Sequence, residues 1–459
     1  MSWRTWIIEF SYLIASVLFV LGLRGMSRPE SARQGMHLAE IGMLLAIVGT
    51  LMVKEIISYE WIIAGLLLGS TAGLAMGVWV PMTAMPQRTA LSHAFGAFAA
   101  SLVGISEYYL RGASMGHFKI GALGFEVLLG SLTTTGSLLA CAKLQGLTPG
   151  APIVYKGQNV FNLSLLGVTV LCFIGLLFFP TIQPLFYVML ALSFVFGILL
   201  VLPIGAADMP VVIALLNSYA GLASAATGMV IANNVLIIAG TLDGGSGFIL
   251  SIVMCKAMNR SMTNVLFGAF GSVTETLAPG QDGQMREVNL EDVAVQLAYA
   301  RQAVFVPGYG MATAQAQHAL RELGDTLENR GVTVKYAIHP VAGRMPGHMN
   351  VLLAEANVPY SQLYELENIN PEFPSTDVAV VIGANDVVNP EARDNPKSII
   401  AGMPILEVDR AKSVVVLKRG QGKGFSGLVN SLFFKPNCGM LYGDAKASLT
   451  QLVQAVRAA

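Results

Sequence analysis

The sequence has little charge and few cysteines. Only 12 % of its 459 residues are Asp, Glu, Lys or Arg, and the basic and acidic residues balance at 28 each. This balance excludes the strongly basic face of a nucleic-acid binder, so we expect no nucleic-acid partner. The four cysteines have no metal or redox spacing, which excludes a secreted disulfide scaffold and predicts no metal site. We interpret them as reduced packing residues; they are Cys141, Cys172, Cys255 and Cys438.

Long apolar runs dominate the first part of the chain. Apolar residues make up 54 % of the sequence, and the mean hydropathy is +0.61, well above the range of soluble globular domains. Nine runs approach the roughly 20 residues that cross a bilayer. They lie near residues 4–24, 36–53, 61–80, 89–106, 118–140, 160–179, 185–203, 209–231 and 233–257. These runs predict a polytopic α-helical membrane domain with about nine transmembrane helices.

Charge is unevenly distributed along the chain. Up to Arg260 there are 12 basic and 9 acidic residues, whereas the shorter remainder has 16 and 19. This shift predicts a transmembrane domain at 1–260, a linker at 261–285 that contains the turn-forming run 278–283, and a soluble domain at 286–459.

The basic residues also predict the orientation in the membrane, because cytoplasmic loops carry more Lys and Arg. One set of loops holds eight basic residues and the other holds four, which places the C-terminal half in the cytoplasm and the N-terminus outside. The eight are Arg24, Arg28, Arg33, Arg88, Lys143, Lys156, Lys256 and Arg260, and the four are Arg4, Lys54, Arg111 and Lys119.

Ionisable side chains inside membrane spans are costly and are therefore functional candidates. His93, Glu126 and Asp243 lie within predicted spans, and Asp208 lies at the border of one. His93 and Asn217 each follow a cytoplasmic helix end by one to two turns, so they could share a water chain with Asp208 at its mouth. The alternative for His93 and Glu126 is a structural bond to a neighbouring helix. Asp243, beside two glycines, could mark a broken helix or a helix boundary.

Small residues at helical spacing form three ridges in the predicted spans, and such ridges let membrane helices approach closely. The second and third are partly polar and lie on consecutive helices, which could enclose water. The ridges are Gly65, Gly69, Gly73 and Gly77; Asn217, Gly221, Ser224 and Gly228; and Gly240, Gly244, Gly247 and Ser251.

The soluble part begins with the pattern of a dinucleotide-binding βαβ unit. A buried strand is predicted at 303–307, then a glycine turn at 308–313, a helix through about Arg330 and a second strand at 332–338. The backbone at Gly308 and Gly310 could receive a pyrophosphate at the helix start. An ordinary strand-to-helix turn is the alternative.

The end of the second strand favours a phosphorylated dinucleotide. That strand runs into His339-Pro340, so no acid is present to hold a ribose 2′-hydroxyl. Lys418 and Arg419 directly follow a predicted strand at 414–417 and could instead hold a 2′-phosphate. A solvated loop tip is the alternative for these two cations.

Two further segments carry candidate ligand contacts. A strand at 378–382 ends in Gly383-Ala384-Asn385-Asp386, where open α/β sheets bind ligands. Arg344 is a candidate phosphate contact, and a plain surface arginine is the alternative.

The sequence resembles the beta subunit family of proton-translocating NAD(P) transhydrogenase. The features that carry the resemblance are the nine apolar runs, the turn at 308–312, the segments 339–350 and 383–386, and the loop that begins Lys418-Arg419. The resemblance covers nearly the whole chain, including 207–219 and 254–260. It implies a soluble α/β Rossmann-like domain with a mostly parallel sheet that binds NADP(H). It also implies an alpha subunit that binds NAD(H), and a dimer of alpha-beta units in the bacterial plasma (inner) membrane.

The same resemblance implies roles for individual residues. His93 and Asn217 match proton-channel positions, and Asp208 matches a coupling residue near the cytoplasmic mouth. Hydride would pass from NADH to NADP⁺ as protons move into the cytoplasm, and it needs no acid–base pair because close approach of the nicotinamide rings suffices. The implied cofactor-binding residues are Gly308, Tyr309, Gly310, Met311, Arg344, Gly383, Asn385, Asp386, Lys418 and Arg419.

Two other functions remain open from the sequence. The chain could be a membrane transporter or channel regulated by a nucleotide-sensing Rossmann-like domain, or a membrane-anchored NADP-dependent reductase. The reductase would need an organic substrate pocket and a general acid in 286–459, and the sequence offers no convincing acid there.

Overall fold

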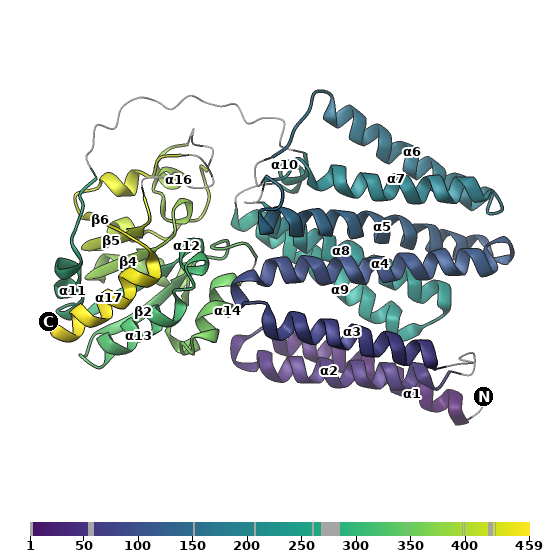
Figure 1. The fold of residues 1–459 in the computed structure, drawn as a ribbon, viewed down its shortest axis with the longest axis horizontal. Coiled ribbons are helices and arrows are strands. Elements are labelled where there is room, and N and C mark those ends of the chain that lie inside the picture. The colour runs from purple at the N-terminus through teal and green to yellow at the C-terminus, as the bar shows by residue number, and fades with distance from the viewer. Residues whose placement is uncertain are drawn as a thin grey trace. The chain divides into compact units, whose positions relative to one another are not determined.

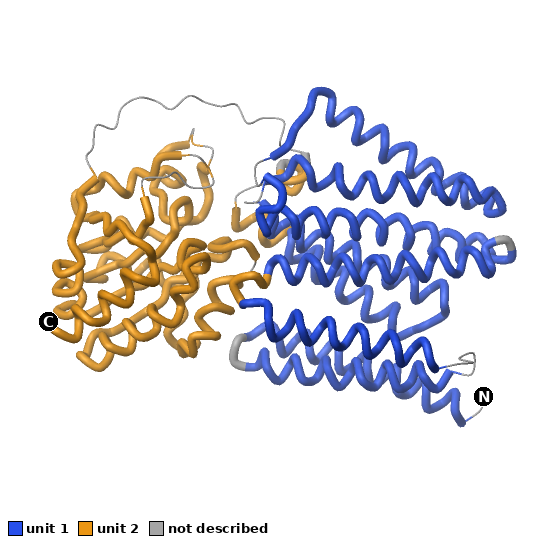
Figure 2. The backbone as a smooth tube through the Cα atoms, in the orientation of Figure 1, with its two compact units in different colours: residues 1–81, 86–251 blue, residues 82–85, 252–459 orange. Residues whose placement is uncertain are grey.

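The structure is a computed structural model that describes residues 3–53, 59–149, 152–205, 208–258, 261–267, 285–345, 347–396, 398, 400–420, 426 and 428–459. The chain forms two compact units (Figure 2). Unit 1 comprises Met1–Pro81 and Pro86–Ser251, and unit 2 comprises Met82–Met85 and Ile252–Ala459. The predicted linker begins with the short helix α10 (Met262–Phe267), whereas Arg260 and the turn-forming run 278–283 lie outside the described residues.

Unit 1 is a bundle of long apolar helices (Figure 1). Within the described residues, nine helices are long and apolar enough to span a bilayer, which confirms the predicted number. Helices α5 and α8 are mostly buried and pack against each other, whereas α3 has no buried residue. The nine are α1 (Trp3–Met26), α2 (Pro29–Leu51), α3 (Glu60–Trp79), α4 (Met85–Arg111), α5 (His117–Gln145), α6 (Gln158–Phe178), α7 (Gln183–Val201), α8 (Met209–Ile231) and α9 (Asn234–Ala257).

Two of the three small-residue ridges pack against each other. A Cβ atom on Gly221 of α8 would lie 2.3 Å from the backbone nitrogen of Gly244 in α9, and one on Gly240 would lie 2.5 Å from that of Ala225. The ridges therefore hold the two backbones in direct contact at these positions. The α3 ridge differs, because no described atom outside that helix lies within 4 Å of a Cβ built on any of its four glycines.

Unit 2 is built on a six-stranded parallel sheet with the strand order β3-β2-β1-β4-β5-β6. The order reverses between β1 and β4, the switch point where open α/β sheets bind ligands. The predicted Rossmann-like fold is confirmed, with every strand pair parallel. The strands are β1 (Gln302–Pro307), β2 (Thr333–Ile338), β3 (Leu363–Glu365), β4 (Val378–Ile382), β5 (Ser413–Lys418) and β6 (Cys438–Tyr442).

Alternate residues of the strands enter two different cores, because successive side chains point to opposite faces of a sheet. In β1, Ala303 and Phe305 enter one core, and Val304 and Val306 enter the other. Both faces are buried, so the central strands are nearly continuous apolar runs. The first core also contains residues of α11 (Leu290–Ala298), α13 (Gln317–Glu328), α14 (His348–Glu355) and α17 (Ala445–Ala458), and the second contains part of α15 (Leu366–Ile369).

A break separates the glycine turn from the predicted helix that follows it. The structure has α12 (Tyr309–Thr313), then Gln315 at φ +49°, and only then α13. The Ala316 N–H donates to the Met311 carbonyl at 3.1 Å, a bond that closes the helix end around a left-handed residue. The predicted glycine turn at 308–313 thus forms a short helix, and the predicted helix through about Arg330 is α13, which ends at Glu328.

Candidate cofactor site and polar groups of the membrane helices

The carboxyl ends of β1 and β4 touch through their backbones. The N–H of Gly308 donates to the Ile382 carbonyl at 2.9 Å, and that of Gly310 donates to the Gly383 carbonyl at 2.8 Å. A Cβ on Gly308 would lie 2.6 Å from the backbone of Ala384, and one on Gly310 would lie 2.6 Å from the Cα of Gly383. These glycines therefore allow two strand ends to meet at the switch point of the sheet.

The helix start after this turn offers few backbone donors. Helix α12 has five residues, and the N–H groups of Met311 and Ala312 donate to the Gly308 carbonyl at 3.1 and 3.4 Å. The N–H groups of Gly308 and Gly310 are bonded to the β4 end as well. The turn thus contributes less to anion binding than the start of a long, uninterrupted helix would.

Asn385 and Asp386, which follow β4 after Gly383 and Ala384, bond residues that precede β6. Ser426 donates to Asp386 from its backbone N–H at 2.9 Å and from its hydroxyl at 2.6 Å. The amide of Asn430 donates to both the backbone carbonyl and the side-chain oxygen of Asn385 at 3.0 Å. The residues after β4 are thus connected by side-chain bonds to Ser426 and Asn430, which precede β6.

Two cations stand at the end of β5. Lys418 is the last residue of the strand, and its Nζ lies 4.6 Å from the centroid of the Phe433 ring. Burial lowers the pKa of Lys418, and the Asp386 carboxylate opposes this effect. Arg419 follows and is exposed. Because β5 neighbours β4, these cations lie at the same sheet edge as Asn385 and Asp386.

Arg344 reaches the glycine turn from the segment after β2. Its guanidinium carbon lies 4.3 Å from the centroid of the Tyr309 ring, and its backbone N–H donates to Nδ1 of His348 at 3.1 Å. Burial and the charge of Arg344 lower the pKa of His348 to about 4, so this imidazole is neutral at physiological pH. The structure therefore brings together two of the predicted cofactor residues, Tyr309 and Arg344.

His339, at the end of β2, is a structural group. Its Nε2–H donates to the Pro404 carbonyl at 2.7 Å, and its Nδ1 accepts from the Val341 N–H at 3.2 Å. Burial lowers its pKa to about 4, although the bond to Pro404 acts in the opposite direction. Both ring nitrogens are thus occupied, and the imidazole connects β2 to the loop at 404.

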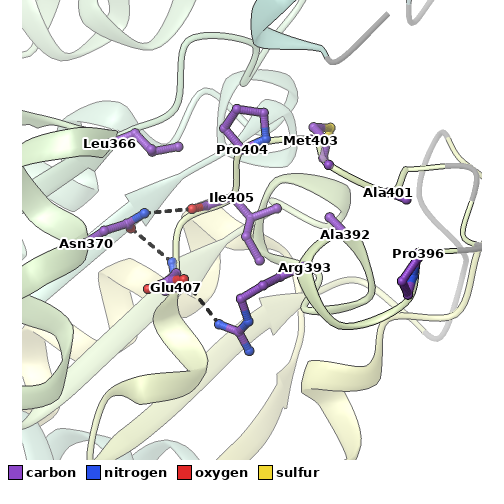
Figure 3. A pocket seen from close by; sticks show the side chains of 11 residues that line it. Leu366, Asn370, Ala392, Arg393, Pro396, Ala401, Met403, Pro404, Ile405 and Glu407 are labelled. Carbon is purple, nitrogen blue, oxygen red and sulfur yellow. Dashed lines mark hydrogen bonds and ion pairs between the residues drawn. The ribbon is translucent and has the colours of Figure 1, made fainter.

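A cavity of about 570 Å³ borders this loop (Figure 3). Its polar side chains bond to their surroundings: Asn370 donates to the Ile405 carbonyl at 2.9 Å and accepts from the Glu407 N–H at 3.1 Å. Arg393 pairs with Glu407 at 3.4 Å and with Asp409 at 2.9 Å. None of the predicted cofactor residues lines the cavity, so it is separate from the switch point.

The predicted membrane residues occupy different elements of unit 1. His93 lies in α4, and its buried Nδ1 has no hydrogen-bond partner among the described residues. Asp208 directly precedes α8, and Glu126 is fully buried in α5. Asn217 of α8 donates to Asp243 of α9 at 3.0 Å. The described hydrogen bonds thus join Asn217 to Asp243 and not to His93.

Helix α9 continues through Asp243, so the alternative of a broken helix or a boundary at this position was wrong. The small residues on both sides of Asp243 belong to the ridge that contacts α8. Of the two glycines after Asp243, Gly244 therefore marks close packing against α8 and not a helix end.

Sequence reasoning missed several of these partners. Ser426 and Asn430 carry no motif, although both are polar residues shortly after the cationic loop. Lys143 was counted only as a loop charge, yet it is buried in the last turn of α5, where its ammonium donates to three carbonyls that follow or end α7. These are Val201, Leu202 and Ile204, at 3.1, 2.6 and 2.8 Å.

Comparison with known proteins identifies the family. Residues 8–455 match the family described as NAD(P) transhydrogenase beta subunit. The NAD(P) transhydrogenase subunit beta of Rhodospirillum rubrum is 47 % identical over 457 residues, which cover 97 % of this chain and 98 % of that protein. The subunit from a designated strain of the same species has the same identity and coverage. The match extends over both units, and the chain therefore belongs to the NAD(P) transhydrogenase beta subunit family.

Proposed function

We propose that this beta subunit holds NADP(H) in unit 2 and carries protons through unit 1, while an alpha subunit holds NAD(H). Hydride passes from NADH on the alpha subunit to NADP⁺ on this chain, driven by protons that enter from outside and leave into the cytoplasm. The observation that carries the cofactor assignment is the convergence of the contacting β1 and β4 ends with Lys418 and Arg419 at one sheet edge.

The residues at this edge fit a dinucleotide with a 2′-phosphate. Lys418 and Arg419 are donors for charge-assisted hydrogen bonds, and β2 ends in a buried, fully bonded His339 instead of an acid. When bound, the nicotinamide supplies the hydride chemistry, and the protein supplies binding and orientation. The proposed contacts are Gly308, Tyr309, Gly310, Met311, Arg344, Gly383, Asn385, Asp386, Lys418 and Arg419.

The side-chain bonds after β4 and β5 give this site a means of responding to its ligand. Asp386 bonds Ser426, and Asn385 bonds Asn430, so a ligand that moves the residues after β4 also moves Ser426 and Asn430. Coupling requires that the two redox states of NADP prefer different conformations of the protein. We assign the response to this pair of connected segments.

The membrane assignments complete the proposal. Residues 1–260 form the proton-translocating domain, residues 261–285 form the linker, and residues 286–459 form the NADP(H) domain. The NADP(H) domain lies in the bacterial cytoplasm. The complex in the inner membrane contains two alpha-beta units. His93, Asn217 and Asp208 belong to the proton path. If His93→Ala left proton pumping and coupled turnover unchanged in a reconstituted alpha-beta complex, this path would be refuted.

Calorimetric titration of the full-length chain in detergent with NADP(H) and NAD(H) tests the cofactor assignment. The Lys418→Ala, Arg419→Ala double variant should lose roughly 100-fold in NADP(H) affinity, because two charge-assisted bonds at about 1.5 kcal/mol each are removed. A matched control removes two cations from α17, Lys446→Ala with Arg457→Ala, and should bind normally. Equal or absent binding of both dinucleotides by the unmodified chain would refute the assignment.

A further inference from the structure

A carboxylate and an amide are paired partway along two of the membrane helices, α8 and α9. Asn217 Nδ2 donates to Oδ1 of Asp243 at 3.0 Å, across the contact between α8 and α9. Asp243 follows Asn234, the first residue of α9, by nine positions, which is roughly 14 Å along a 24-residue helix. Asp243 therefore lies too far from both ends of α9 to be a residue of a helix terminus.

The backbone contacts around the pair hold it in place. Ser218, the neighbour of Asn217, donates its hydroxyl to the Gly244 carbonyl at 2.7 Å. A Cβ on Gly247 would lie 2.9 Å from Nδ2 of Asn217, so glycine is needed where the amide passes α9. The small-residue ridges thus bring both side chains to one position between the helices.

The two members of the pair differ in what they can do with a proton. An amide does not titrate at physiological pH, whereas a carboxyl group can bind and release a proton. A hydrogen bond that only joined two helices would need no ionisable partner, and an ionisable partner inside a bilayer is costly. Among the described residues Asp243 forms no ion pair, and it is exposed on the surface of this chain.

We propose that Asp243 is the proton-carrying group at this depth of the membrane path and that Asn217 is its positioning residue. The inference rests on the proton function proposed above for unit 1. Oδ2, which has no hydrogen bond within the described chain, takes a proton from water on one side, and an O–H bond forms. That bond breaks when the proton passes to water on the other side, which restores the carboxylate without any transfer of electrons.

The test uses the complete alpha-beta complex in sealed vesicles, with a pH-sensitive dye for pumping and absorbance for hydride transfer. Asp243→Asn has nearly the same shape and still accepts a bond from Asn217, so it removes only the titratable group. We expect pumping and coupled turnover to fall at least 10-fold, with NADP(H) affinity unchanged. Asp243→Glu should recover part of the pumping. Ser246→Ala is the matched control on α9, because its hydroxyl bonds only the backbone carbonyl of Asp243, and it should behave as the unmodified complex.

An exchange of the pair, Asn217→Asp with Asp243→Asn, re-forms the bond and returns a carboxyl group to the same place. It should pump faster than Asp243→Asn alone. Pumping by Asp243→Asn within twofold of the unmodified complex overturns the inference, as does the failure of both Asp243→Glu and the exchange to recover pumping. An unmodified complex that transfers hydride without pumping overturns the proposed function itself.

Discussion

Alanine substitutions at three glycines separate the cost of a steric clash from the cost of a left-handed backbone. Two of these glycines lie at the contact between the ends of β1 and β4, and the third is a control. A Cβ on Gly310 would lie 2.6 Å from the Cα of Gly383, and Gly310 has no positive φ, so this variant introduces only a steric clash. Gly383 has both features, with φ at +64° and a Cβ position 2.3 Å from the Cα of Gly310. Gly331 is the matched control for backbone strain alone, because its φ is +86° and no described atom lies within 4 Å of its Cβ position.

The expected losses of unfolding free energy follow from these geometries. An extra methyl group in a closely packed place costs about 1–3 kcal/mol, and a left-handed backbone costs a side-chain-bearing residue about 1–2 kcal/mol. Gly310→Ala should therefore lose about 1–3 kcal/mol and Gly331→Ala about 1–2 kcal/mol. Gly383→Ala should lose about 2–5 kcal/mol, because it combines both effects.

Hydrogen exchange of the β1 and β4 amides, measured on the full-length chain without cofactor, reports these free energies of opening. Gly310→Ala that exchanges as slowly as the unmodified chain would show that the strand ends do not touch. Equal losses for Gly383→Ala and Gly331→Ala would refute the steric part of the argument, since backbone strain would then explain both.

Three buried or partly buried polar groups supply the remaining predictions. The pKa of His339 is about 4 when folded against 6.5 when unfolded, so its contribution is complete above pH 6.5 and up to about 3 kcal/mol is lost as the pH falls toward 4. Urea titrations across this range should show that slope, and His339→Gln should remove it. Lys143→Met leaves three carbonyls without their donor and should lower the thermal unfolding temperature of the chain in detergent, with partial recovery in Lys143→Arg. Ser426→Ala removes a hydroxyl bond to Asp386 and should speed amide exchange at 428–432 while β1 exchange stays constant.

The strands differ in how far the sequence predicts them. Strands β1, β4 and β5 are buried on both faces, so their apolar runs stand out from the flanking residues. Strand β3 has three residues, too few for any period to be visible. Strand β6 contains Gly439, where a Cβ would lie 2.6 Å from Val288, so a close contact interrupts its pattern of strand-forming residues.

The sequence by itself determined the membrane spans, the strands β1, β4 and β5 and the cations at the end of β5, because apolar length, strand patterning and residue order are local properties of the chain. Only the tertiary structure decided which groups meet. Asn217 and Asp243 are 26 positions apart on different helices, and Gly310 meets Gly383 across two different strand ends. Periodicity shows which face of an element is buried but not which neighbour covers it, so the partners at both sites depend on how the helices and strands pack.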